Sequence, residues 1–156
     1  MNKTRQKTAI AIIGVLLVLS VIFIFSNSFE SGARSNAVSG RFAKLFGGVI
    51  RALFGEDANV NYIVRKCAHI AEFALLGALT LTFVKLLTEY TGKKLFFCGL
   101  FGTLLVAVID EYIQSFTGRT SMVGDILLDF FGAVLGMVAA FLLYIVIRKC
   151  RKQNGD

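Results

Sequence analysis

The chain alternates between long apolar runs and short polar segments. Four runs approach the roughly 20 residues that an α-helix needs to cross a bilayer, and they cover residues 8–26, 67–87, 95–113 and 122–147. Inside a bilayer only helices and closed barrels satisfy all of their backbone hydrogen bonds. The pattern therefore predicts an all-α fold: an integral membrane bundle of four transmembrane helices, with residues 1–156 forming a single membrane domain.

A different pattern occupies the segment between the first two runs. Its apolar residues recur at the spacing of one helix face: Val38, Phe42, Leu45, Phe46, Val49, Ile50 and Leu53. Arg41, Lys44 and Arg51 lie off that stripe. This favours an amphipathic helix at about residues 36–54 on the outer membrane surface, with its bases towards anionic headgroups. The alternative is a helix that packs over the bundle. The polar residues 55–59 predict a turn.

The charged residues predict the orientation. The chain carries 17 Lys and Arg against 10 Asp and Glu, and its net charge is +7. With the N-terminus inside, most bases fall on the cytoplasmic side: Lys3, Arg5, Lys7, Lys85, Lys93, Lys94, Arg148, Lys149, Arg151 and Lys152. The only acids there are Glu89 and Asp156. An excess of bases marks the cytoplasmic side, so we expect both termini in the cytoplasm.

Two other interpretations of the bases are weaker. Bases before an apolar run also mark a secretory signal, but the apolar part of a signal is usually about 7–15 residues. The first run is longer, which favours an uncleaved anchor. Nucleic acid is not an expected partner, because the chain offers no soluble domain to carry a basic surface. The expected partners are membrane lipids.

Polar side chains interrupt the last three runs. A charge at the centre of a membrane helix costs about 2.5–3.5 kcal/mol, so such residues are expected to face the bundle interior. Their helical spacing and depth place them in one layer beneath the outer surface. This predicted polar pocket consists of Arg65, Lys66, His69, Glu72, Asp110, Glu111, Gln114, Arg119, Asp125 and Asp129. Arg119 either binds a carboxylate or phosphate or anchors a helix end at the interface.

Two glycines share a face with the acids of the last run. Gly132 and Gly136 have the GxxxG spacing that permits close approach of two membrane helices, and they continue the spacing of Asp125 and Asp129. We therefore expect this face to pack against a neighbouring helix. The acids would then be drawn into the bundle.

At these residues the chain resembles the VanZ-like family. One signature is residues 65–73, RKCAHIAEF, followed by Gly77. The other is residues 110–116, DEYIQSF, followed by Gly118, Arg119, Asp125, Asp129, Gly132 and Gly136. Residues 25–28, FSNS, resemble the short serine-containing segment of the family. Two residues depart from the pattern: Phe73 stands where Tyr is frequent, and Asp129 where Asn is common.

The resemblance implies a bacterial cell membrane protein linked to resistance against the glycopeptide teicoplanin. Teicoplanin carries a fatty acyl chain, so an outward polar pocket is a place to interfere with a lipidated or lipid-linked molecule at the outer leaflet. We expect such a non-enzymatic role at the cell envelope, with no cofactor and no metal.

Two alternatives remain open. One is a membrane-embedded hydrolase or transferase acting on a lipid headgroup, in which His69 and the acids supply acid–base chemistry or hold a divalent metal. The chain has no nucleophile motif and no HExxH pattern in support. The other alternative is structural, in which the acids pair with Arg65, Lys66 and Arg119 to fix helix packing.

Overall fold

The structure is a computed structural model that describes residues 3–30, 32–87, 93–117 and 122–153. Its helices are α1 (Lys3–Phe29), α2 (Gly32–Phe54), α3 (Val60–Leu87), α4 (Lys93–Phe116) and α5 (Val123–Gln153). Four of them, α1, α3, α4 and α5, are long and apolar enough to cross a membrane. The predicted all-α membrane bundle and the additional amphipathic helix are therefore confirmed.

The helices extend beyond the predicted runs. The second run was predicted to begin at residue 67, whereas α3 begins at Val60; the last was predicted to end at residue 147, whereas α5 ends at Gln153. An apolar run marks only the part of a helix that lies in hydrocarbon. The backbone continues as helix through the interface, where polar and charged side chains reach water.

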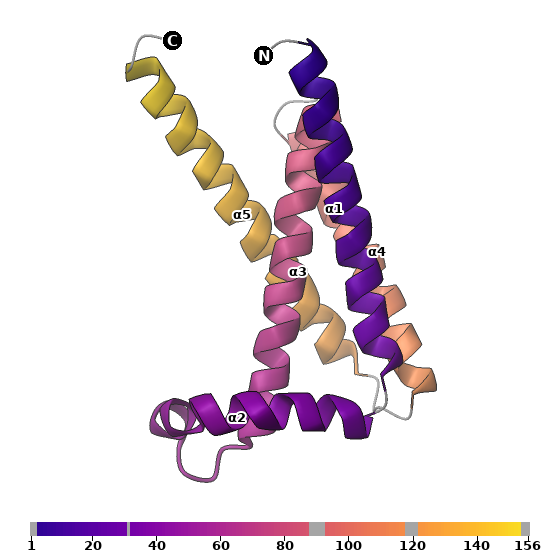
Figure 1. Cartoon of the computed structure of the whole chain (residues 1–156), viewed down its shortest axis with the longest axis vertical. Coiled ribbons are helices and arrows are strands. Elements are labelled where there is room, and N and C mark those ends of the chain that lie inside the picture. Colours follow the sequence, from indigo (N-terminus) through magenta and orange to yellow (C-terminus); the bar gives the residue numbers. More distant parts are fainter. Residues whose placement is uncertain (1–2, 31, 88–92, 118–121, 154–156) are drawn as a thin grey trace.

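The helix α3 is the centre of the bundle. It contacts each of the other four helices, and its interface with α5 is the most extensive. Figure 1 shows α1, α3 and α4 running side by side, while α5 crosses α3 and diverges from it. The buried core joins all four spanning helices through Ile24, Phe73, Leu76, Ala107 and Ala133.

The two ends of the bundle differ. The start of α1 and the end of α5 lie at one end, and α2 lies across the opposite end, roughly perpendicular to the other helices (Figure 1). Gly55 terminates α2 with a φ of 97°, and its N–H donates to the carbonyl of Arg51 at 2.8 Å, as in a glycine C-cap. Asn59 then caps α3, because its Oδ1 accepts from the N–H of Tyr62 at 3.1 Å. The predicted turn lies between these caps.

Candidate functional site

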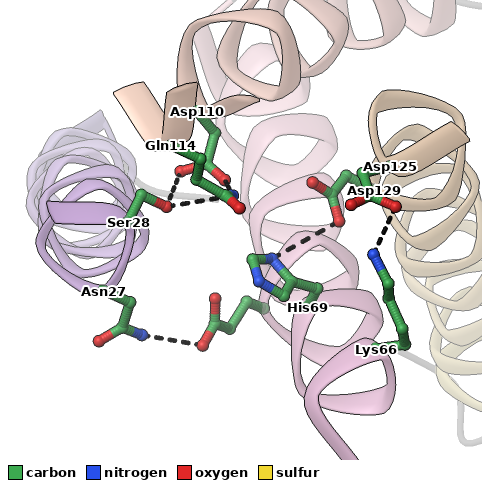
Figure 2. A network of polar contacts seen from close by, with 9 residues as sticks. Asn27, Ser28, Lys66, His69, Asp110, Gln114, Asp125 and Asp129 are labelled. Atoms are coloured by element: carbon green, nitrogen blue, oxygen red, sulfur yellow. Dashed lines mark hydrogen bonds and ion pairs between the residues drawn. The ribbon is translucent and has the colours of Figure 1, made fainter. Parts of the chain in front are cut away.

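A cluster of polar side chains lies inside the bundle, towards the end crossed by α2. We call it the polar cluster; Figure 2 draws its members, which come from α1, α3, α4 and α5. They are Asn27, Ser28, Lys66, His69, Glu72, Asp110, Gln114, Asp125 and Asp129. Because four helices contribute, the cluster forms only when the whole bundle is assembled.

The most buried part joins α1 to α4 around Asp110, which is fully buried. Ser28 Oγ donates to one carboxylate oxygen of Asp110 at 2.6 Å, and Gln114 Nε2 donates to the other at 2.7 Å. Gln114 Nε2 also lies 3.4 Å from Ser28 Oγ. A buried polar group without a partner costs about 1–3 kcal/mol. The three side chains therefore satisfy one another's hydrogen-bonding groups in this buried position.

A second link joins α1 to α3. Asn27 Nδ2 donates to Glu72 Oε1 at 2.9 Å in a partly buried position. Asn27 and Ser28 are adjacent in the sequence, so the last turn of α1 reaches Glu72 with one residue and Asp110 with the next (Figure 2).

A third part joins α3 to α5 through a salt bridge and a close approach of a histidine to a carboxylate. Lys66 Nζ contacts Asp125 Oδ1, with both side chains partly exposed. One turn deeper, His69 Nδ1 lies 3.7 Å from Oδ1 of Asp129, whose side chain is 2% exposed. The exposed rim of the cluster is thus a salt bridge, and its interior holds a histidine facing a buried carboxylate.

Glycines allow α5 to approach α3 this closely. A Cβ added at Gly132 would lie 2.7 Å from the carbonyl oxygen of Ile70. At Gly136 it would overlap the carbonyl group of Ala74, and at Gly77 of α3 it would overlap that of Ala133. Both helices therefore supply a glycine at the crossing, and the face with Gly132 and Gly136 is the one that carries Asp129.

Two predicted pocket residues are placed differently, and a third lies outside the described residues. Glu111 Oε1 accepts from the N–H of Met122 at 2.7 Å, so this side chain fixes the start of α5. Its Oε2 is buried with no hydrogen-bond partner in the part of the chain that the structure describes. The guanidinium of Arg65 lies over the ring of Tyr62, 5.9 Å from its centroid. Arg119 lies outside the described residues.

The cluster also contains a possible set of metal ligands. One ligand atom each from His69, Asp110 and Asp129 lies within 4.8 Å of the others. A histidine with two carboxylates is a donor set found at divalent metals. The three residues come from α3, α4 and α5.

A comparison with known proteins identifies the family. The model of the family described as VanZ/LLP1 matches residues 11–146. The chain belongs to the VanZ/LLP1 family. No curated protein and no solved structure matches it detectably.

Sequence reasoning did not place Asn27 and Ser28 in the pocket of this VanZ/LLP1 protein. The spacing argument started from charges, and these two residues carry none. Two signals pointed to them: they follow an apolar run directly, and they lie in the segment FSNS that entered the resemblance. Thr117 was also missed; its Oγ1 lies 2.9 Å from the carbonyl oxygen of Gln114 and 3.3 Å from that of Ser28, where the end of α4 meets α1.

Proposed function

We propose that this VanZ/LLP1 protein is a non-enzymatic protein of the bacterial cell envelope. In this proposal the polar cluster binds or excludes a lipid-linked or lipidated molecule at the outer leaflet, and the protein acts in glycopeptide (teicoplanin) resistance. The orientation rests on the bases, most of which lie at the end of the bundle where α1 begins and α5 ends, as expected for the cytoplasmic side. In this orientation the cluster lies towards the outer leaflet.

One observation carries the proposal: polar side chains from four helices meet inside the bundle. Two carboxylates of the polar cluster, Asp110 and Asp129, are each at most 2% exposed. Apolar residues would hold a bundle core together without the cost of burying these carboxylates. Ionisable residues inside a membrane segment are by default candidates for a functional site.

The experiment is teicoplanin susceptibility in a sensitive host that expresses the wild type, Glu72→Ala or Asp110→Ala. Membrane levels of each protein are measured in the same cells. We expect the wild type to protect, and both variants to lose protection at equal protein levels. Thr103→Val is the control, since Thr103 is buried in α4 but its hydroxyl contacts only the carbonyls of Gly99 and Leu100 among the described residues.

A glycopeptide without the acyl chain separates the part played by the lipid tail. Protection against both drugs would place the recognition on the peptide core, whereas protection against teicoplanin alone would place it on the lipidated form. If all variants protect as well as the wild type, the polar cluster serves helix packing only. That outcome contradicts the proposal.

A second candidate function has its own observation, the grouping of His69, Asp110 and Asp129 within 4.8 Å. It is a metal-dependent hydrolase or transferase acting on a lipid headgroup, with the metal activating water. Metal analysis of purified protein and turnover of polyprenyl phosphates test it. Stoichiometric metal that His69→Ala abolishes would favour this candidate; absence of both metal and turnover would refute it.

A further inference from the structure

The helix α2 has two opposite faces. Four large apolar side chains share one face and are between 48% and 74% exposed: Phe42, Phe46, Val49 and Leu53. Lys44 and Arg51 lie on the other face, since residues in a helix advance by about 100° each. An amphipathic helix of this kind lies with its apolar face in the acyl-chain layer. Its basic face is then at the level of the lipid headgroups.

The basic face does not simply face solvent. It forms one wall of a groove of about 650 Å³ between α2 and residues 58–61, which lead into α3. Ligand sites typically enclose about 300–1,000 Å³. Lys44 and Arg51 line the wall on α2, and Asn59 and Asn61 line the wall opposite.

Two glycines line the groove between its basic residues, and one of them leaves its floor open. Gly47 and Gly48 lie between Lys44 and Arg51 in the sequence and also line the groove. A Cβ added at Gly48 would meet no atom within 4 Å. The two basic residues are roughly 10 Å apart along the helix axis, so their long side chains can reach a single anion placed over the glycines.

The two basic side chains are available for a ligand. Both are exposed, and neither forms an ion pair with any residue in the ranges that the structure describes. An ammonium, a guanidinium and amide N–H groups are the donors that proteins use for phosphate. The Oδ1 of Asn59 is occupied by the N–H of Tyr62, which leaves the amino group of its side chain to donate.

We propose that this groove binds the phosphate of an anionic phosphoglycerol headgroup. Lys44 and Arg51 hold the phosphate, Asn59 and Asn61 donate to it or to the glycerol hydroxyls, and the apolar face of α2 lies among the acyl chains. The groove shares no residue with the polar cluster. The lipid-binding proposal can therefore be tested independently of the proposed resistance function.

The test uses the full chain in nanodiscs of phosphatidylcholine that contain a minor fraction of phosphatidylglycerol. Native mass spectrometry counts the phosphatidylglycerol molecules retained by each protein. We expect Lys44→Gln and Arg51→Gln each to weaken retention about tenfold, from the loss of one charge-assisted hydrogen bond. Arg41→Gln is the matched control, because Arg41 is an exposed base of the same helix that does not line the groove.

A second variant keeps every charge. Gly48→Leu fills the open floor without removing a base, and we expect it to abolish selective retention while helix content by circular dichroism stays unchanged. The proposal is overturned if Arg41→Gln weakens retention as much as Lys44→Gln, since retention would then reflect diffuse surface charge. It is also overturned if Gly48→Leu retains phosphatidylglycerol like the wild type.

Soluble glycerol phosphate tests whether the groove recognises the headgroup alone or only a headgroup that belongs to a membrane lipid. If it displaces the retained lipid from the wild type, the groove recognises the headgroup alone. If millimolar glycerol phosphate does not compete although the variants behave as expected, the groove recognises the phosphate only within a membrane lipid. Both results support the proposal and differ in what they assign as the ligand.

Discussion

The two halves of α5 are similar in apolar character and opposite in packing. In the first half, Gly132, Ala133, Gly136 and Met137 are buried against the bundle. In the second half, residues 141–150 are all exposed, and Figure 1 shows this part of α5 diverging from α3. A contact described there is that of the Lys85 ammonium with the ring of Tyr144.

The difference shows what holds helices together in a bilayer. Lipid tails are as apolar as leucine, so exposed apolar side chains such as Leu142 and Val146 gain nothing from leaving lipid for protein. The first half has small residues that allow backbone contact and carboxylates that find partners on α3. Apolarity inserts α5 into the membrane, and glycines and polar pairs attach it to the bundle.

The largest loss of stability is expected from adding a methyl group at the glycine contact between α3 and α5. Gly136→Ala places a methyl group into the carbonyl of Ala74, so α5 must move away from α3, at a cost of about 3 kcal/mol or more. Gly102→Ala is the control, because a Cβ there meets no atom within 4 Å and alanine favours the helix by about 1 kcal/mol. Unfolding by detergent titration measures both. Equal stabilities would show that the close crossing does not hold α5.

The next largest loss of stability is expected from removing the carboxylate of Asp110. Asp110→Ala removes the acceptor of two buried donors, Ser28 and Gln114, and we expect a stability loss of about 2–3 kcal/mol. Asp110→Asn keeps a side chain of the same shape that can bond to both, so its loss should be below about 1 kcal/mol. The same detergent titration compares them. A loss in Asp110→Asn as large as in Asp110→Ala would mean that the charge itself stabilises the bundle.

A smaller loss of stability is expected from the salt bridge at the exposed rim of the polar cluster. Lys66 and Asp125 are partly exposed, and such ion pairs typically contribute about 0.2–1 kcal/mol. A double-mutant cycle with Lys66→Met and Asp125→Asn isolates their coupling. A coupling above about 2 kcal/mol would show that the rim, rather than the buried interior, holds α5.

The smallest loss of stability is expected in the second half of α5, which diverges from α3. Tyr144→Leu removes the ring under Lys85, and an exposed cation–π contact is worth about 0.5–1 kcal/mol. We therefore expect a stability close to that of the wild type. A spin-label distance between the C-terminal ends of α3 and α5 should then be unchanged. A large increase in that distance would show that the contact with Lys85 holds the second half of α5 to the bundle.

The sequence predicted the fold well because the membrane constrains it strongly. Runs of about 20 apolar residues must become spanning helices, and the stripe containing Phe42 and Phe46 had to form a separate amphipathic helix. The ends of the helices were less predictable. The segment 60–66 contains Asn61, Arg65 and Lys66, so its hydropathy does not reveal that it continues α3.

The site was predictable where charge marked it and not elsewhere. His69, Asp110 and Asp129 stand out because an ionisable residue within an apolar run is costly, and Lys66 stands out because it directly precedes such a run. Asn27 and Ser28 lie at a helix end, where uncharged polar residues are common, and only their partners in space reveal them. Spacing along one helix also could not decide that Lys66, and not Arg65, pairs with Asp125, because that choice depends on how α3 rotates against α5.

The central claim is that the charge of the polar cluster serves a function beyond packing. The most direct test is teicoplanin susceptibility of cells that express Asp110→Asn, with Thr103→Val on the same helix as the control and membrane levels equalised. We expect Thr103→Val to protect like the wild type, and Asp110→Asn to remain folded and lose protection. Full protection by a folded Asp110→Asn would contradict it and leave the cluster as a device for holding the helices together.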